Sequence, residues 1–303
     1  MLQVVLTGLS NGAIYGIVAM AYALVYYVTR VINFANGQIM MASVMVTAVL
    51  TIHRVPVPWA VCAGIATSVV LSLVVYAVGI APVLRFSRFS FAWLVSTLGL
   101  GIIIESLAAV IWGVDSLPFP ALLNNKDVII GGARMPWQGV LSVGVGLLLI
   151  AGFELMRRKT LFGKMGTAIS TDPEIASSIG GNVLFFTILV FALAGLLLGI
   201  AGILVGPNSF ADAYLGESFG ISGFVALMIG GIESPSGAML GGFILGVLQS
   251  FAVTYLNPQA DDWFPFVMVV AGLLILPNGI FTSGGAIKAL VRRVGARTSG
   301  ARS

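Results

Sequence analysis

Long runs of apolar residues alternate with short polar breaks along most of the chain. A helix needs about 20 predominantly apolar residues to cross a bilayer. The runs are continuously apolar and too long for strands, so they predict transmembrane helices and disfavour a closed barrel. We predict nine candidate spans, at residues 2–28, 37–52, 57–81, 90–112, 139–156, 183–205, 216–231, 237–256 and 262–277.

Three of these candidate spans, at 37–52, 216–231 and 262–277, are short for a full crossing. Eight full spans with one re-entrant piece are therefore an alternative to nine. In either case the expected fold class is an all-α, polytopic transmembrane helical bundle. We expect residues 1–282 to form this domain. The tail at 283–303 is basic and rich in Gly, Ser and Arg, so we expect it to be partly disordered.

The composition agrees with a chain surrounded by lipid. Of its 303 residues, 58% are hydrophobic and 9% are charged, and the mean hydropathy is +1.06. Soluble domains carry roughly 25% charged residues, so this chain has too few to cover a water-exposed surface. The net charge of +4 does not indicate nucleic-acid binding, because the basic residues lie in short clusters between apolar runs. The lipid bilayer is the expected surrounding.

The distribution of Lys and Arg predicts the orientation of the spans, because cytoplasmic loops carry an excess of them. One alternating set of loops holds only Arg54, Lys126 and Arg134. The other set holds Arg30, Arg85, Arg88, Arg157, Arg158, Lys159, Lys164, Lys288, Arg292, Arg293, Arg297 and Arg302. We therefore expect the larger set and the C-terminus to be cytoplasmic. With nine crossings the N-terminus is outside; with eight, one end changes side or one piece is re-entrant.

A polar stretch, GKMGTAISTDPEIASSIGGN at residues 163–182, interrupts the apolar pattern. The residues at 171–174, Thr-Asp-Pro-Glu, are typical of a helix start, and the glycine pair at 180–181 is typical of a stop. We expect a helix of about seven residues between them. Asp172, Ala176 and Gly180 would share one of its faces. It is either an ordinary surface helix in a loop or a helix that a cytoplasmic partner grips.

Glu105 is the only acidic residue well inside a predicted span. Stranding a charge at the centre of a bilayer costs at least about 2.5–3.5 kcal/mol. Glu105 must therefore face a polar interior, pair with another group or be protonated. It is a candidate for the substrate pathway, and a structural hydrogen bond is the alternative.

Other polar residues are further candidates for the pathway. Asn33, Asn36 and Gln38 lie in the break between the first two spans, where they either line the route or form a simple cytoplasmic turn. Asn11, Ser96 and Thr97 are pathway candidates or interhelical hydrogen-bond partners, which is the more usual role of such residues.

Glycines recur at a spacing of four residues in several spans. They are Gly8, Gly12 and Gly16 in the first span, and the pairs Gly195 and Gly199, Gly237 and Gly241, and Gly242 and Gly246. This spacing places small residues on one helix face and predicts close packing against a neighbouring helix.

The sequence offers no set of residues for catalysis or metal binding. His53 is the only histidine and Cys62 the only cysteine, and no HExxH motif is present. A P-loop is also absent, because Gly163-Lys164 is followed by Met165 and position 158 is Arg instead of Gly. We expect no catalytic residue, no metal and no ATP site in this chain.

Five segments resemble those of a known family, in the family's order. They are GLSNGAIYGIVAMAYALVY at 8–26, VINFANGQIMM at 31–41, FGKMGTAISTDPEIASSIGGN at 162–182, LMIGGIESPSGAMLGGFILGVLQ at 227–249 and LPNGIF at 276–281. They resemble the opening span, the Asn-Phe-Ala-x-Gly signature, the coupling loop, the glycine-rich block and the closing motif of permeases of ATP-driven branched-chain amino acid importers. The chain departs from the family at three positions: it has Asn36 where the family often has His, Thr167 where the family usually has Arg, and Leu276 where the family often has Arg. Because of these departures, the resemblance does not by itself identify the substrate.

The resemblance implies a permease subunit of the bacterial cytoplasmic (inner) membrane that forms half of a pore and works by alternating access. It implies a second homologous permease, two cytoplasmic ATPase subunits that bind ATP and Mg, and a periplasmic or extracellular solute-binding protein. The implied substrates are hydrophobic amino acids, with urea or short amides as alternatives. The implied contacts with the ATPase lie in a coupling loop at 157–182, at Lys164, Asp172, Pro173, Glu174, Ala176 and Gly180.

Two other classes of protein are alternatives. A stand-alone secondary transporter or channel predicts several ionisable groups within the membrane, and Glu105 alone argues against it. An intramembrane enzyme predicts a paired acid–base set or a metal set, which we do not find in the sequence.

Overall fold

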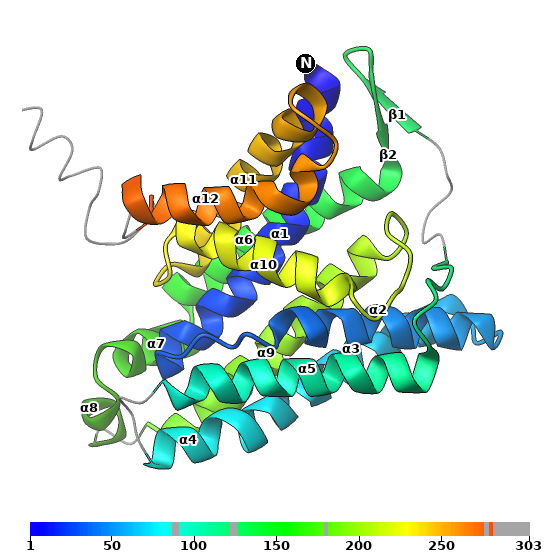
Figure 1. Ribbon diagram of the computed structural model, residues 1–303. Helices are drawn as coiled ribbons and strands as arrows, with labels where there is room; N and C mark the ends of the chain where they lie inside the picture. Colours follow the sequence, from blue (N-terminus) through cyan, green and yellow to red (C-terminus); the bar gives the residue numbers. More distant parts are fainter. Residues whose placement is uncertain (87–90, 121–126, 179–180, 276–278, 281–303) are drawn as a thin grey trace, which may run out of the picture.

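The computed structural model describes residues 1–86, 91–120, 127–178, 181–275 and 279–280. This part of the chain is built mainly of helices (Figure 1). Within it, six helices are long and apolar enough to cross a membrane, and three shorter apolar helices occupy the places of the three short candidate spans. The all-α, polytopic bundle predicted from the sequence is confirmed. The tail at 283–303 lies outside the described residues.

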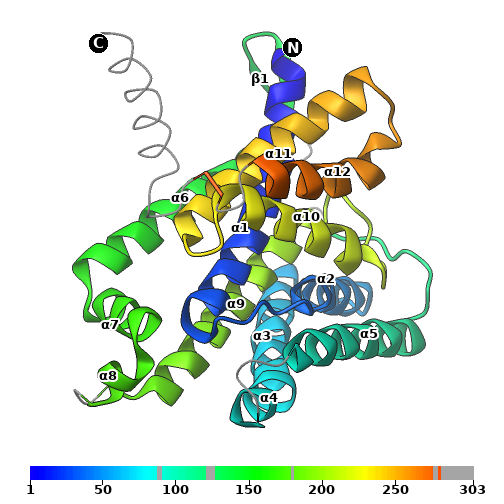
Figure 2. The ribbon, with the colours of Figure 1, turned by 60° about the vertical axis from the view of Figure 1, so that its left-hand side comes forward.

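Helix α1 (Leu2–Thr29) runs through the middle of the bundle and packs along α11 (Pro235–Tyr255), as Figures 1 and 2 show. The predicted glycine stripes meet at this contact. A Cβ atom on Gly8 would lie 2.6 Å from the Cα of Val247, and one on Gly12 would lie 2.7 Å from the carbonyl oxygen of Gly242. Both distances are too short for a real Cβ atom, so the two backbones touch only because these residues are glycine.

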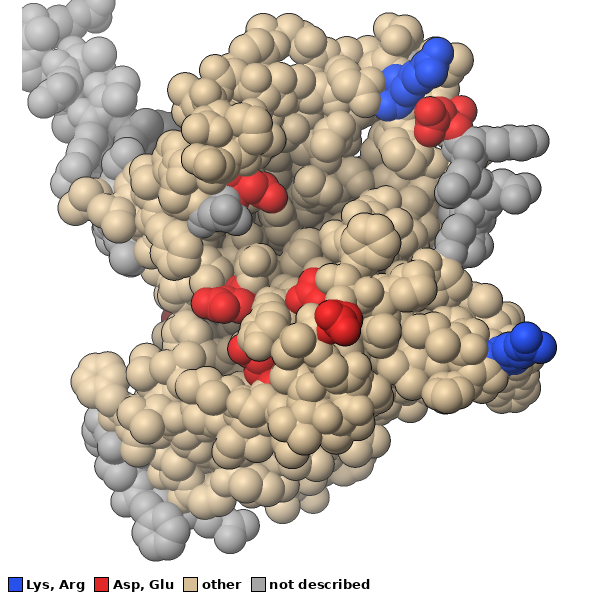
Figure 3. All heavy atoms as spheres, turned by 45° about the vertical axis from the view of Figure 1, so that its right-hand side comes forward, with Lys and Arg blue, Asp and Glu red and all other residues tan. Residues whose placement is uncertain are grey.

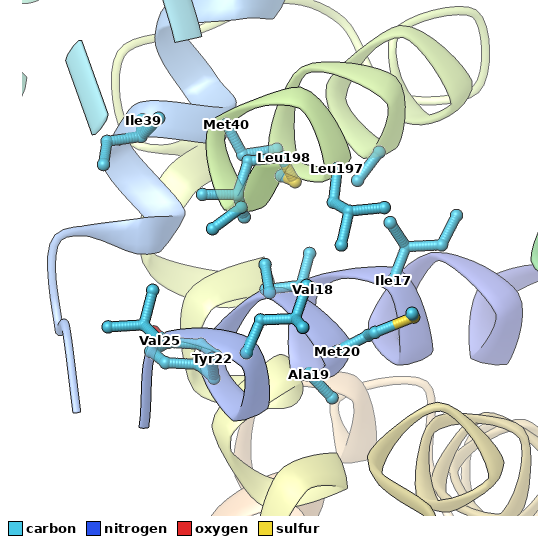
Figure 4. Close-up of a cluster of buried hydrophobic side chains, with 14 of the residues drawn as sticks. Ile17, Val18, Ala19, Met20, Tyr22, Val25, Ile39, Met40, Leu197 and Leu198 are labelled. Carbon is cyan, nitrogen blue, oxygen red and sulfur yellow. The ribbon is translucent and has the colours of Figure 1, made fainter. Parts of the chain in front are cut away.

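Helices α2 (Asn36–Ile52) and α9 (Val183–Val205) complete the core on the other side of α1. Figure 4 shows side chains of α1 facing those of α2 and α9. The labelled residues are Ile17, Val18, Ala19, Met20, Tyr22, Val25, Ile39, Met40, Leu197 and Leu198, and all are buried. Because lipid is as apolar as these side chains, their contacts stabilise the bundle mainly through close packing.

A second layer is formed by α3, η1, α4 and α5. Helix α3 (Val57–Val75) continues through a π-helical turn, η1 (Tyr76–Ile80), into α4 (Ala81–Phe86), and α5 (Ala92–Trp112) lies beside them. A π turn widens the helix and changes the partners of its carbonyl groups. The Ser96 hydroxyl of α5 donates a hydrogen bond of 2.9 Å to the carbonyl oxygen of Gly79 in this turn.

A β-hairpin that the sequence analysis did not predict precedes α6 (Trp137–Lys159). Strands β1 (Asp127–Ile130) and β2 (Ala133–Pro136) pair antiparallel, and Gly131 and Gly132 form the turn with φ of 57° and 86°. Positive φ at both central residues is typical of a tight hairpin turn. The amide of Gln3 binds the backbone of Arg134 through two hydrogen bonds, of 2.6 and 2.8 Å, and thereby joins the hairpin to the start of α1.

The remaining helices lie at two places. Helices α10 (Leu215–Gly230) and α12 (Ala260–Ile275) pack beside α11, whereas α7 (Leu161–Thr171) and α8 (Pro173–Ser178) lie at the end of the molecule away from the hairpin (Figure 1). We name these the hairpin end and the α7–α8 end.

Candidate functional site

The polar stretch at 163–182 contains parts of two helices, where the sequence analysis predicted one. Helix α7 ends at Thr171, and α8 begins at Pro173, with the backbone of Asp172 extended between them. The predicted helix start at 171–174 is therefore present, as is a short helix after it, six residues long. Helix α7 is an addition to the prediction, although its buried residues Gly163, Gly166 and Ile169 recur at helical spacing.

Helix α7 packs into the bundle through its small and apolar residues. Gly163 lies against the backbone of Arg157, and Ile169 is fully buried. The ring of Phe162 lies 4.5 Å from that of Phe186 in α9, measured between centroids. The opposite face of α7 exposes Lys164. The helix is therefore held firmly on one side and open to contact on the other.

The residues predicted to bind an ATPase occupy different environments. Lys164 is exposed on α7, Asp172 is half-buried between the helices, and Pro173 and Glu174 begin α8. Ala176 is only 1% exposed, so its side chain packs within this chain. Gly180 lies outside the described residues. The coupling role of these residues stays a prediction.

Arg30 connects α7 to two distant parts of the chain, and the sequence analysis used it only for orientation. It follows α1 in a left-handed conformation, with φ of 58°. Its guanidinium donates to the Glu233 carboxylate at 2.6 Å and to the carbonyl oxygen of Ser170 at 2.8 Å. Burial alone would lower the pKa of Arg30, but the Glu233 carboxylate outweighs it and holds that pKa above its ordinary value. Arg30 therefore stays charged.

This arrangement, which we call the Arg30 clamp, joins the end of α1, the last turn of α7 and the loop between α10 and α11. Its members are Arg30, Ser170 and Glu233. The clamp borders a pocket of ≈ 600 Å³ at the α7–α8 end. Arg30 and Glu233 are 203 positions apart, so no local pattern reveals their pairing.

On another face, two adjoining pockets form a cleft between α1, α10, α11 and α12. Their volumes are ≈ 380 and ≈ 520 Å³, and both are lined by Asn11, Tyr15, Gln249 and Asp261. Asp212 and Glu217 also line the larger pocket. We name this pair of pockets the acidic cleft. Figure 3 shows acidic side chains around the hollowed middle of one face, with Lys and Arg only towards its edges.

The predicted pathway residues fall into separate groups. Asn11 lines the acidic cleft. Asn33 and Asn36 are fully buried, and the Asn33 amide donates to the Oδ1 of Asn36 at 2.8 Å. The same Asn33 side chain accepts a hydrogen bond from the Ala35 amide. Both asparagines therefore shape the break before α2.

Ser96 and Thr97 lie in α5 and make local or interhelical hydrogen bonds. Ser96 binds the π turn, as described above. Thr97 is fully buried and donates to the carbonyl oxygen of Leu94 at 3.3 Å. For Ser96 and Thr97, and for Asn33 and Asn36, a role in the pathway stays a prediction.

Glu105 accepts a hydrogen bond of 3.4 Å from the Gln38 amide and is half-buried. Together with Glu217 these residues line a pocket of ≈ 390 Å³, which we name the α5 pocket. Glu217 also lines the acidic cleft, so the two hollows adjoin. Glu105 therefore lies at a pocket and also has a hydrogen-bond partner in α2, and its role in the substrate pathway stays a prediction.

The comparison with protein families decides the class of the protein. The model of a family described as the permease component of the branched-chain amino acid transport system matches residues 4–276. The chain belongs to this family. Its apolar helices and this membership make it an integral inner-membrane protein and a permease subunit of an ABC importer.

Several curated relatives match over almost their whole length. The permease LivH of Salmonella typhimurium, named for high-affinity branched-chain amino acid transport, is 28% identical over 92% of this chain and 94% of its own. BraD of Pseudomonas aeruginosa, with the same description, is 27% identical over 92% and 95%. A probable LivH of Methanocaldococcus jannaschii is 26% identical over 87% of both chains.

Proposed function

We propose that this subunit carries branched-chain or other hydrophobic amino acids inward by alternating access, with urea or short amides as alternative cargo. The names of its relatives support the amino-acid cargo. The pore is completed by a second homologous permease. Two ATPase subunits, which bind ATP and Mg, act at the α7–α8 end, and a solute-binding protein delivers cargo at the hairpin end.

The orientation follows from the same proposal. The α7–α8 end and the C-terminus face the cytoplasm, and the N-terminus is external. The concentration of Lys and Arg at 157–159 and at Lys164 supports this orientation, because positive loops stay inside. This chain has no ATP site of its own and is driven by its partners.

The Arg30 clamp is the observation that supports coupling through α7 and α8. A push on α7 displaces the carbonyl group of Ser170, which Arg30 holds together with Glu233. Glu233 lies in the loop that begins α11, and Arg30 ends α1. These two helices line the acidic cleft. A contact at the α7–α8 end can thereby bias the equilibrium between conformations of the cleft.

The test reverses one charge on α8. We expect Glu174→Arg to reduce ATP-driven amino-acid uptake in proteoliposomes about tenfold, because it alters the proposed ATPase contact. The matched control is Asp127→Arg in the hairpin, which makes the same change of charge at the other end and should leave ATPase assembly unaffected. Ala176 is not substituted, because its side chain is buried and a change would disturb folding.

The readouts are uptake, the amount of ATPase co-purified with the permease, and the amount of permease in the membrane. We expect Glu174→Arg to lose uptake and ATPase together while the permease level stays constant. Uptake and ATPase retention equal to those of the unaltered protein would refute the coupling role of α8.

A further inference from the structure

The acidic cleft contains acceptor groups, and the residues that the structure describes place no cation beside them. Asp212, Glu217 and Asp261 contribute carboxylates, and no Lys, Arg or His is among the described residues that line its two pockets. In the described part of the chain, no three of His, Cys, Asp and Glu lie close enough to share a metal ion.

Gln249 supplies a second, independent indication of a ligand. It lines both pockets and is only 4% exposed. Its Nε2 donates to the Oδ1 of Asp261 at 2.8 Å and to the backbone oxygen of Asp261 at 3.1 Å. Its Oε1 has no hydrogen-bond partner among the described groups. A buried acceptor left unpaired costs about 1–3 kcal/mol, so this oxygen calls for an N–H or O–H donor.

The apolar residues that line the cleft indicate the chemistry of the remaining part of the ligand. Leu215, Phe219 and Phe266 line the larger pocket beside the carboxylates. The ring of Tyr15 lies 5.7 Å from that of Phe219, between centroids. This combination provides apolar and aromatic surface next to acceptors, as suits a small organic cation with an apolar group.

We propose that the acidic cleft binds the primary ammonium group of the transported solute. The carboxylates of Glu217 and Asp261 attract the charge, and the Oε1 of Gln249 accepts one of its N–H bonds. A quaternary ammonium has no N–H donor and leaves Gln249 unpaired. No cation among the described lining residues can pair with a carboxylate group of the solute in these pockets. The inference rests on the proposed function, because it places the cleft on the route of the solute.

The test measures equilibrium binding to the assembled importer in lipid nanodiscs, without ATP and without the solute-binding protein. Three probes share one branched carbon skeleton: 3-methylbutylamine, its N,N,N-trimethyl derivative and 4-methylpentanoate. By isothermal titration calorimetry we expect only the primary amine to bind. Glu217→Gln and Asp261→Asn are each expected to weaken that binding about tenfold, since each removes a charged acceptor.

Asp127→Asn is the matched control, because it removes an exposed carboxylate outside the cleft. It should leave the affinity for 3-methylbutylamine unchanged. Equal binding of the amine and its trimethyl derivative, binding of 4-methylpentanoate, or no binding of the amine would each overturn the proposal. Since binding is measured without ATP, its failure is separate from the loss of ATP-driven uptake that tests the proposed function.

Discussion

The charged groups at the two functional regions are arranged in opposite ways. At the α7–α8 end, carboxylates are paired within the chain: Glu233 binds Arg30, and Glu154 binds Arg157 and Arg158 at 2.7 and 2.5 Å. In the acidic cleft, the backbone amide of Tyr214 donates a hydrogen bond to Asp212, and the side-chain amide of Gln249 donates one to Asp261. Glu217 has no hydrogen-bond donor among the described residues. Glu154 and Glu233 are thus paired with arginines of this chain, whereas the carboxylates of the cleft have no such ion pair among the described residues.

The difference follows the task of each region. The pair between Arg30 and Glu233 is about half exposed on each side, so it adds only about 0–1 kcal/mol to stability. The main effect of this ion pair is to hold the end of α1 in place relative to α7. The carboxylates of the cleft accept hydrogen bonds only from neutral groups among the described residues, so their charge is not neutralised and creates a negative potential that favours cations.

The largest expected effect comes from breaking the clamp. Arg30→Glu removes the guanidinium that holds Ser170 and places two carboxylates together. We expect amino-acid uptake in proteoliposomes to fall about tenfold or more, as coupling between the ends is lost. The double variant Arg30→Glu with Glu233→Arg restores the pair with reversed polarity and should recover part of the uptake. A double variant no better than the single one would show that the pair does not couple the two ends.

A smaller effect on uptake is expected when a cation is placed beside the carboxylates of the cleft, as arginines are beside Glu154 and Glu233 at the α7–α8 end. Glu217→Lys gives the remaining carboxylates an internal cation, which opposes the entry of a cationic group. We expect uptake to fall about fivefold, as for the change of one charge contact in a hydrated site. Glu217→Gln provides the comparison and should lie between the lysine variant and the unaltered protein. If Glu217→Lys takes up amino acid as fast as the unaltered protein, the charge of the cleft does not contribute to transport.

Gln38→Leu tests the hydrogen bond between α2 and Glu105 in the α5 pocket. It removes the donor at 3.4 Å and leaves the carboxylate without it. We expect thermal unfolding in detergent to show a loss of about 1 kcal/mol. Thr67→Val is the control, since that hydroxyl bonds only within its own helix at 2.9 Å. Equal losses for both variants would mean that the contact with Glu105 adds nothing of its own.

The smallest effect is expected at the hairpin. Gln3→Ala removes both hydrogen bonds to Arg134, each worth about 1 kcal/mol at most in this exposed position. Limited proteolysis should then cut the turn at Gly131 and Gly132 faster, while uptake stays the same. A marked loss of uptake would show that the hairpin takes part in the transport cycle.

The apolar spans were predictable because each one is encoded locally. The run at 183–205 coincides with α9, and the glycine stripes of α1 and α11 meet as their spacing indicated. Lipid requires a continuous apolar stretch for each crossing, so a single short window of sequence contains the signal.

The parts that escaped prediction depend on residues far apart in the chain or on weak local patterns. Gln249 meets Asp261 only because α11 and α12 fold against each other, and Arg30 meets Glu233 across 203 positions. Helix α7 was not predicted, because the sequence analysis treated residues 163–182 as one polar stretch with a single short helix in it. Of the residues that line the acidic cleft, the sequence analysis named only Asn11 as a site candidate, and it named neither Gln249 nor Asp261.

The contact between the backbones of α1 and α11 has a mechanical consequence. Where Gly8 and Gly12 meet Val247 and Gly242, the nearest atoms are backbone atoms, so a change of side-chain rotamer can absorb little of a displacement. Because their backbones are in direct contact, α1 and α11 move together as one rigid unit. A movement imposed on the last turn of α1 therefore reaches Gln249 with little loss along the way.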